Sequence, residues 1–186
     1  MRLTNLQQKL DMNPVIAAIR EDFFEEALSS PAEVIFLLEG DIISLPDKIF
    51  LAHQNGKVVF VHIDLVKGVG KDKSGVEFLA KIGVDGIITT KAPLIKAAKE
   101  IGVLSVQRCF ALDSQSVESI RQIMLSAKPD LIEIMPGIAE KVIRKFSLDK
   151  TPIIAGGLVE SKAETMAVLS AGASAVSTGK KELWYI

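Results

Sequence analysis

The chain has 186 residues, of which 48% are hydrophobic, and a formal net charge of -1. A chain of this length and composition can bury one large core, so we expect a single domain that spans residues 1–186. The near-neutral charge excludes a global positive field for nucleic acid but leaves room for a local basic patch. The single cysteine, Cys109, excludes an internal disulfide and a cysteine metal cluster, which fits a reducing compartment.

No stretch of the sequence has the pattern of a membrane span or a signal peptide. The apolar runs all fall short of the roughly 18 residues that a membrane helix needs, and no long apolar core follows a basic start at the amino terminus. We therefore expect a cytoplasmic protein without a membrane partner. Composition leaves the oligomeric state open, and a homo-oligomer is compatible with it.

The chain alternates short apolar runs with amphipathic helical segments from one end to the other. Residues 1–13 are predicted to form a helical extension with Leu3, Leu6 and Leu10 on one side at helical spacing. The predicted strands cover residues 15–19, 34–39, 58–64, 86–90, 104–110, 131–135, 152–157 and 175–179. The predicted helices that follow the first seven strands cover residues 21–28, 46–54, 75–82, 93–100, 114–126, 139–146 and 162–171.

Capping and loop residues set several of these boundaries. Ser44 is expected to cap the helix at 46–54, and Ser161 and Glu164 have the S-x-x-E spacing of a capping box. The segment 65–73 contains two glycines and three lysines. We expect this segment to be a long, mobile loop, because glycine and clustered charge favour irregular structure.

Eight strands joined by helical crossovers predict a parallel sheet that closes on itself. Eight parallel strands form the (β/α)8 or TIM-type barrel, which carries its ligand sites at the carboxyl ends of the strands. The extension, residues 1–13, would plug the opposite end. An open doubly wound sheet is the alternative, and the lack of G-x-G-x-x-G after the first strand counts against its dinucleotide-binding form.

The ends of the seventh and eighth strands have the features of a phosphate site. Both end in residues with little or no side chain, which leaves backbone N–H groups accessible to an anion, and barrels commonly bind phosphate there. The predicted phosphate-binding residues are Gly156, Gly157, Ser177, Thr178 and Gly179. The alternative for the two hydroxyls is a structural role in hydrogen bonds to neighbouring loops.

Polar side chains at other strand ends are candidates for the same cavity. His62 and Asp64 alternate onto one face at the end of the third strand. Glu133 lies between apolar neighbours in the sixth strand and needs a partner, which Arg108 or Lys91 can supply. The structural alternatives are a His62–Asp64 pair that holds a loop and a salt bridge inside the barrel. The spacings match no known metal motif, so we expect no metal site.

Four motifs carry a resemblance to a known family. The sequence contains H-I-D-L at 62–65, Q-R-C-F-A-L-D at 107–113, P-D-L-I-E-I-M-P-G at 129–137 and I-A-G-G-L at 154–158. With Asp85–Lys91 and the closing residues 177–184, the chain resembles the glycerol uptake operon antiterminator family from about Pro14 to Trp184. It departs from the family at 89–91, where Thr-Thr-Lys replaces the usual Ser-Thr-Arg and removes a bidentate donor.

The resemblance implies a TIM-type barrel that senses glycerol 3-phosphate and binds leader mRNA, preventing premature transcription termination. It implies an effector but no cofactor, and no catalytic residue. The effector-binding residues expected beside the phosphate site are His62, Asp64, Lys91, Gln107, Arg108, Glu133 and Gly137. The basic residues that are candidates for RNA phosphates are Lys67, Lys71, Lys73, Lys180 and Lys181.

The alternative function is a sugar-phosphate enzyme of the isomerase, epimerase or aldolase class. In that case Glu133 or Asp64 would act as the base and His62 as the acid. A lysine inside a strand would favour this class. The lysines near strand ends, Lys67 and Lys91, instead lie at the starts of loops.

Overall fold

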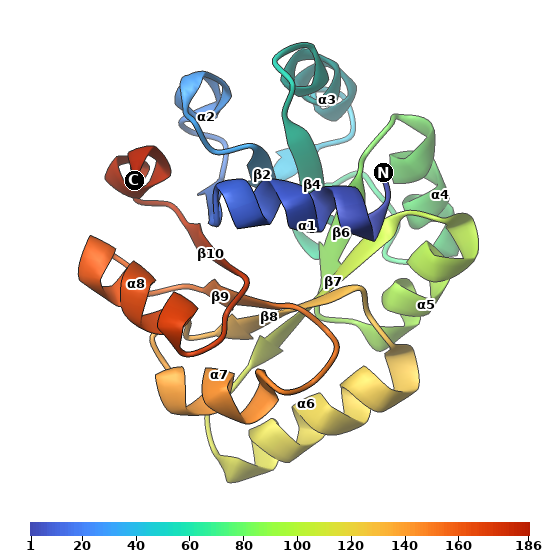
Figure 1. Ribbon diagram of the computed structural model, residues 1–186. Helices are drawn as coiled ribbons and strands as arrows, with labels where there is room; N and C mark the ends of the chain where they lie inside the picture. The colour runs from blue at the N-terminus through green and yellow to red at the C-terminus, as the bar shows by residue number, and fades with distance from the viewer.

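The computed structural model describes residues 1–186 and shows a closed barrel of eight parallel strands (Figure 1). The barrel strands are β1 (Val15–Ile19), β2 (Val34–Leu37), β4 (Val58–His62), β6 (Gly86–Thr89), β7 (Leu104–Phe110), β8 (Leu131–Met135), β9 (Ile153–Gly156) and β10 (Ala175–Thr178). Each strand pairs with the next in this order, and β1 pairs with β10 to close the ring. The predicted (β/α)8 fold is confirmed.

One helix precedes the first strand, and the other helices surround the barrel and lie between consecutive strands (Figure 1). They are α1 (Leu3–Met12), α2 (Phe24–Ser29), α3 (Leu45–Gln54), α4 (Lys73–Lys81), α5 (Ala92–Ile101), α6 (Ser114–Ala127), α7 (Glu140–Phe146) and α8 (Lys162–Ser170), with 3-10 turns η1 (Ile63–Leu65) and η2 (Lys181–Tyr185). None of these helices combines the length and the apolar character needed to cross a bilayer.

Helix α1 lies across one end of the barrel (Figure 1). Its buried residues, Leu6 and Leu10, belong to the cluster that fills the barrel interior, together with Ile16, Phe36 and Phe60. The Phe36 and Phe60 rings lie 5.5 Å apart. The apolar face of α1, which was predicted from the sequence, therefore covers the amino-terminal ends of the strands. The carboxyl ends remain open for a ligand site.

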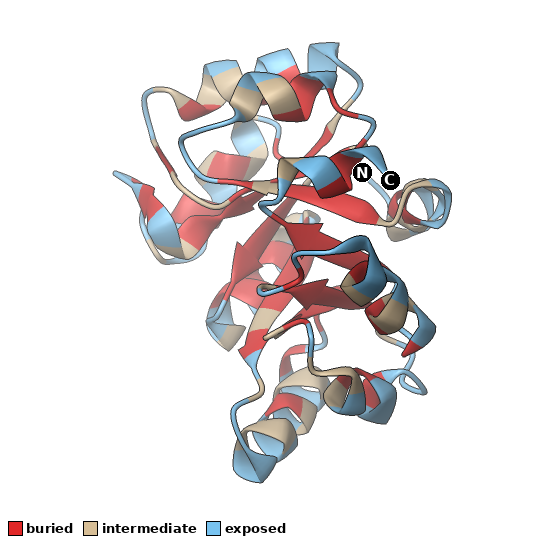
Figure 2. Cartoon of the chain, turned by 90° about the vertical axis from the view of Figure 1, so that its left-hand side faces the viewer, coloured by how far each residue is buried: buried red, intermediate tan, exposed pale blue.

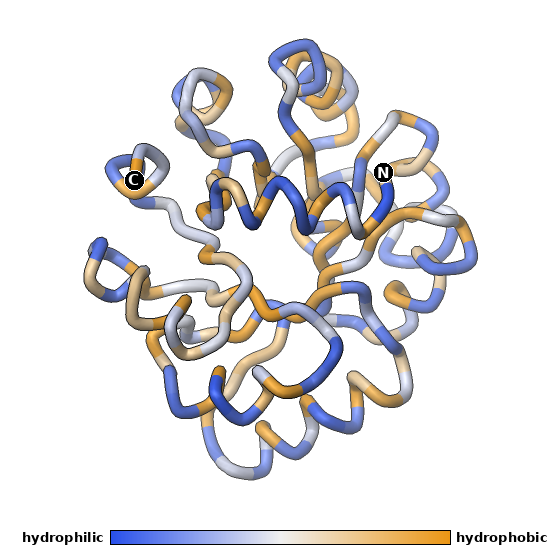
Figure 3. Tube along the Cα trace, viewed as in Figure 1, coloured by the Kyte–Doolittle hydropathy of each residue, from blue (hydrophilic) through white to orange (hydrophobic).

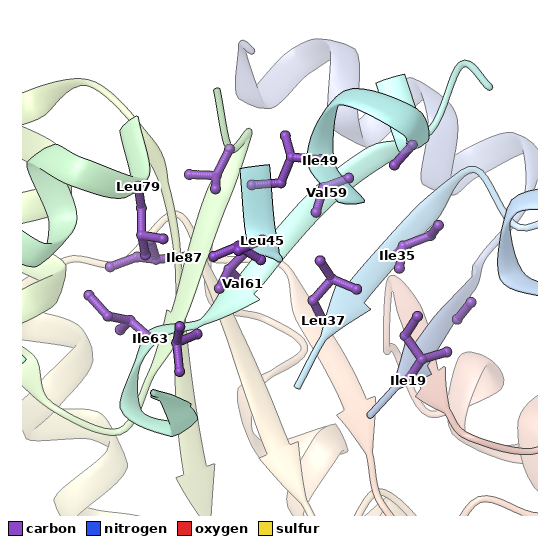
Figure 4. Packing of buried hydrophobic residues seen from close by; sticks show 14 of the residues in the cluster. Ile19, Ile35, Leu37, Leu45, Ile49, Val59, Val61, Ile63, Leu79 and Ile87 are labelled. Carbon is purple, nitrogen blue, oxygen red and sulfur yellow. The ribbon is translucent and has the colours of Figure 1, made fainter. Parts of the chain in front are cut away.

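Both faces of the strands are apolar, and the barrel is buried inside and out (Figures 2 and 3). Outward-facing residues such as Val59 and Ile87 pack under the surrounding helices against Ile49 of α3 and Leu79 of α4 (Figure 4). Burial on two sides explains why the strands appear in the sequence as continuous apolar runs rather than as alternating patterns. Side-chain direction still alternates along each strand, which decides which residues reach the barrel interior.

The segment 65–73 is the main correction to the sequence analysis. In place of a long irregular loop, it continues η1 into β5 (Val66–Lys67), which pairs in parallel with β3 (Gly40–Asp41). The Lys71 ammonium donates to the carbonyl oxygens of Ile63 and Val66, each at 2.5 Å. Backbone pairing and a bound ammonium hold this segment against the barrel, in contrast to the mobile loop expected from the sequence.

Three helices begin at a side-chain cap, and the cap expected at Ser44 is absent. Capping boxes are present at α6, from Asp113 and Ser116, and at α8, from Ser161. The Ser44 side chain makes no cap to α3 and instead donates to Asp41 at 2.7 Å, because the β3 turn places that carboxylate within reach. Asp72, which the sequence analysis did not single out, caps α4.

Candidate functional site

A cavity of about 480 Å³ opens at the carboxyl ends of the strands. It is lined by the loops that follow β1, β9 and β10 and by side chains from β7 and β8. Three cationic residues, Arg20, Arg108 and Lys180, face three acidic ones among the lining residues. The cavity is therefore close to neutral as a whole, so local hydrogen-bonding groups rather than net charge decide what it can hold.

Backbone amides at the ends of β9 and β10 are available to a ligand. The N–H groups of Gly157, Leu158 and Gly179 donate to no protein acceptor, and all three residues line the cavity. Gly157 has a φ of 74°, in the left-handed region that glycine tolerates best. These amides match the expectation that small residues leave the backbone accessible here. Bare N–H groups that converge on one cavity suit an oxyanion.

The helix that follows β9 does not contribute its amino terminus to this cavity. The amides of Glu160 and Ser161 donate to the Glu164 carboxylate, at 2.8 and 3.0 Å, within the capping box of α8. Those donors are satisfied inside the protein. Helix α8 itself begins at Lys162, and none of its residues lines the cavity, so the donors available to a ligand are those of the strand ends.

Gly156 and the two hydroxyls of β10 have structural partners. Ser177 donates to Oε1 of Glu133 at 2.6 Å, and Thr178 donates to the Val159 carbonyl at 2.9 Å. A Cβ atom on Gly156 would lie 2.4 Å from the same Glu133 oxygen, so the missing side chain makes room for the glutamate. The structural alternative considered for the hydroxyls describes Thr178, whereas Ser177 is part of a polar network at the cavity.

Glu133 and Arg108 form a buried pair on the cavity wall. Nε of Arg108 lies 2.6 Å from Oε2 of Glu133, and the two side chains are 10% and 1% exposed. The residues stand side by side in the register of β7 and β8. The two terminal guanidinium nitrogens of Arg108 contact no protein acceptor. Arg108 is thus the partner that the buried glutamate required, and it keeps donors available for a ligand.

His62 and Asp64 lie outside the lining of the cavity and differ in their surroundings. His62 is 3% exposed and its Nδ1 has no hydrogen-bond partner. Burial, aided by the nearby Arg108 charge, lowers the pKa of His62 to about 4. Burial raises the pKa of Asp64, but hydrogen bonds from Thr90 and Thr89 outweigh it and lower the pKa overall. Asp64 fastens η1 to the end of β6 through Thr89 and Thr90 and makes no hydrogen bond to His62.

Three more expected effector-binding residues lie away from the cavity lining. Gln107 faces outward, because its neighbour Arg108 faces inward, and its amide nitrogen donates to the Thr90 carbonyl at 2.9 Å. The Gly137 N–H donates to the carbonyls of Gly156 and Gly157 at 2.6 and 2.9 Å. Lys91 is exposed at the start of α5. Of the seven residues expected there, the structure brings Arg108 and Glu133 to the cavity.

The lysines considered for RNA all have partners. Lys67, Lys73, Lys180 and Lys181 approach Glu21, Glu100, Glu160 and Glu26, respectively, at 2.7 to 3.7 Å. Lys180 and Lys181 lie near the cavity, and the Lys181 ammonium sits 4.1 Å from the centre of the Phe23 ring. Exposed ion pairs of this kind contribute little to the free energy of folding, so another anion can replace the carboxylate partner readily.

Three of the cavity-lining residues that were not expected from the sequence lie close to strand ends. Asp22 and Phe23 follow β1, and Leu158 follows β9. Phe23 and Leu158 adopt φ values of 64° and 60°, which are uncommon for residues with a side chain, and both are exposed. All three lie within four residues of a strand end, so a broader window around the strand ends would have found them.

Two further features bear on the chemistry that the barrel could support. None of the eight barrel strands contains a lysine, so no strand supplies an amine for a Schiff base. The structure has no cluster of three or more histidine, cysteine, aspartate or glutamate side chains that could hold a metal ion. Cys109 is buried, and burial raises the pKa of its thiol to about 12.

Fold and cavity together define a single-domain TIM barrel with a ligand-sized cavity at the carboxyl ends of its strands. The model of the family described as glycerol-3-phosphate responsive antiterminator matches residues 15–184. The chain belongs to this family.

Relatives of the chain include both sequences and solved structures. The uncharacterized protein YgcP of Escherichia coli K12 is 34% identical, with 94% of this chain and 93% of that protein covered. A glycerol uptake operon antiterminator-related protein from Thermotoga maritima is 38% identical, with 91% and 96% covered and a TM-score of 0.83. The glycerol uptake operon antiterminator regulatory protein from Listeria monocytogenes is 33% identical, with 92% and 95% covered and a TM-score of 0.88.

More distant structures share the barrel alone. Deoxyribose-phosphate aldolases, at 9% and 12% identity with TM-scores of 0.71 and 0.68, are among them. At this level of identity the likeness concerns the fold. These neighbours therefore carry no argument for an aldolase reaction in this chain.

Proposed function

We propose that the protein is a transcription antiterminator that binds glycerol 3-phosphate in the cavity and, in response, binds leader mRNA of glycerol-uptake genes. The family description and the names of the Listeria and Thermotoga relatives support this proposal. The observation that carries it is the convergence of unpaired amides and a buried arginine on one cavity. The effector is the small molecule proposed here, with no cofactor and no catalytic residue.

The phosphate group would lie against the strand ends of β9 and β10. The free amides of Gly157, Leu158 and Gly179 provide donors, and the side chains of Arg20 and Lys180 at the rim add positive charge. Small residues allow the oxygens to approach the main chain closely. This arrangement resembles the phosphate-binding loops common to the last two strands of TIM barrels.

The glycerol end would lie against the polar wall of the cavity. Arg108 offers unpaired donors and Glu133 offers carboxylate oxygens, both next to the cavity. Uncharged hydroxyl groups need donors and acceptors more than net charge, which the neutral Arg108–Glu133 pair provides. His62, buried nearby with a free ring nitrogen, is a third candidate on this side.

The surface proposed for RNA comprises the exposed lysines of the carboxyl-terminal face. Lys67, Lys73, Lys180 and Lys181 have flexible carboxylate partners that phosphates could replace. Lys71 is less suited, because its ammonium is bound to two carbonyls and burial lowers its pKa. An RNA partner would place the protein in the cytoplasm.

Titration calorimetry with glycerol 3-phosphate, followed by leader RNA from a glycerol-uptake operon of the same organism, tests the proposal. We expect saturable binding of the effector and tighter RNA binding in its presence. Inorganic phosphate and a scrambled RNA of equal length are the controls. Absence of effector binding, or RNA binding that does not distinguish leader from scrambled RNA, would contradict the proposal.

A further inference from the structure

The polar wall of the cavity has an unusual arrangement of donors and acceptors. Glu133 is held by Ser177 on one oxygen and by Arg108 on the other, each at 2.6 Å. Gly156 leaves the space that the carboxylate occupies. The carboxylate is thus fixed in position by two strands, and each of its oxygens retains a lone pair that a ligand can use.

Next to these acceptors stand donors without partners. Arg108 is 10% exposed, and its Nε is engaged while its two terminal nitrogens contact no protein acceptor. Because these terminal nitrogens are not sealed from solvent, their N–H groups can donate to a ligand oxygen in the cavity.

A fixed acceptor beside a fixed donor suits a group that both donates and accepts. We infer that the Glu133–Arg108 pair recognises a secondary alcohol, so the cavity selects 2-hydroxy three-carbon phosphates over their 2-keto analogues. A hydroxyl can donate to Glu133 and accept from Arg108 at once. A ketone oxygen can accept from Arg108, but it has no hydrogen to donate to Glu133. Its lone pairs face the Glu133 carboxylate, and the two oxygens repel each other.

This inference rests on the proposed function, since it concerns how the same effector is distinguished. It adds that the protein responds preferentially to the alcohol member of a redox pair of three-carbon phosphates over the corresponding ketone. The specificity-determining group is the Glu133 carboxylate. Ser177 and Gly156 act through it as positioning residues.

Titration calorimetry of the wild-type protein with three phosphates provides the first test. The ligands are glycerol 3-phosphate, dihydroxyacetone phosphate and propane-1,3-diol monophosphate, which lacks an oxygen on the central carbon. We expect both analogues to bind at least about tenfold more weakly than glycerol 3-phosphate, because each loses the hydrogen bond to a charged acceptor. Analogue affinities within about threefold of glycerol 3-phosphate would overturn the inference.

Glu133→Gln provides the second test, because its amide can donate to a ketone. We expect the preference for glycerol 3-phosphate over dihydroxyacetone phosphate to disappear in this variant. The matched control is Glu140→Gln, which removes an exposed carboxylate that also pairs with an arginine, Arg144 at 3.3 Å. It should keep the wild-type preference.

The outcomes separate the inference from the proposed function. A preference that persists in Glu133→Gln would overturn the inference while leaving the effector site intact. Failure of all three phosphates to bind the wild-type protein would overturn the proposed function and the inference with it. If Glu133→Gln does not fold, the three wild-type affinities decide.

Discussion

Gly157 has a backbone conformation that favours glycine, and it also lies where a side chain would block access to the cavity. Its φ of 74° is strained for other residues, and a Cβ there would lie 2.7 Å from the Met135 side chain, which lines the cavity. Gly157→Val should therefore fill the space above the free amides and weaken glycerol 3-phosphate binding by about 100-fold or more, or about 2.7 kcal/mol. Calorimetric titration of the folded variant measures this loss.

The control for Gly157→Val is Gly102→Val. Gly102 has a φ of 88° and no atom within 4 Å of an added Cβ, so this variant carries comparable backbone strain without touching the cavity. Both variants should lose about 1–3 kcal/mol of stability from strain. Unchanged binding in Gly157→Val, or an equal loss of binding in Gly102→Val, would remove Gly157 from the phosphate site.

His62 makes stability depend on pH. Its pKa is lowered from 6.5 to about 4 by burial, so the unfolded chain takes up a proton at a higher pH than the folded protein. Between these two values the free energy of unfolding falls as the pH falls, by up to about 3 kcal/mol from this group. His62→Gln should flatten the dependence of Tm on pH between 6.5 and 4.5.

The second histidine provides the control for that measurement. His53 lies on the surface with a side chain 39% exposed, paired with Asp85. His53→Gln should leave the wild-type slope of Tm against pH in place. If His62→Gln leaves the slope of Tm against pH unaltered, carboxylates rather than this imidazole cause the loss of stability at low pH.

Side-chain direction decided which residue-level expectations agreed with the structure. The buried charge of Glu133 predicted a partner, because an unpaired carboxylate inside a barrel is costly, and Arg108 fills that role. Alternation along β7 places Gln107 on the opposite face from Arg108, so the two cannot both reach one cavity. Partners of Asp64 and Ser177 come from strands distant in sequence, which no local pattern reveals.

At the scale of elements, the apolar runs and one of the two capping signals gave correct predictions, whereas the expected Ser44 cap is absent. Continuous apolar runs marked the eight barrel strands, and the S-x-x-E spacing marked the start of α8. The two-residue strands β3 and β5 escaped prediction, because a strand that short has no period to detect. Their pairing makes the segment 65–73, which was expected to be a mobile loop, part of the scaffold.

Helix α1 should contribute to stability as a cover of the barrel interior. Leu10 is 2% exposed, so Leu10→Ala should lower the free energy of unfolding by about 2–5 kcal/mol through lost burial and the cavity left behind. Met12 of the same helix is 84% exposed, and Met12→Ala should change stability by less than about 0.5 kcal/mol. Urea unfolding measures both. Equal effects would mean that α1 does not cover the core.

At the scale of the whole molecule, effector and RNA must influence each other equally if they are coupled. A coupling of about 1–3 kcal/mol would tighten RNA binding roughly 5- to 150-fold in the presence of glycerol 3-phosphate, and saturating leader RNA would tighten the effector by the same factor. Titrations in both orders measure the two factors. Effector affinity that is indifferent to saturating RNA would refute coupling between the sites.

The cationic surface can be tested separately with paired lysine variants. Lys67→Ala with Lys73→Ala should weaken RNA binding and reduce its dependence on salt, while the effector affinity without RNA stays unchanged. Lys96 and Lys99 of α5 are also exposed, and their double alanine variant is the matched control. RNA affinity that is equal in the two double variants would place the RNA surface elsewhere on the protein.

The closure of the ring by β1 and β10 has a consequence for the order of assembly. All other strand pairs join neighbouring parts of the chain. The pairing of β1 with β10, in which Val15 lies beside Val176, joins segments that are separated by most of the chain. A sheet in which β10 has not yet paired would already position the amide of Gly157. It would not position the amide of Gly179, because that residue follows β10. Trp184, buried with its ring nitrogen 2.8 Å from the Thr178 carbonyl, holds the last strand in place. The capacity to bind the effector would thus emerge in the slowest, least local step of folding.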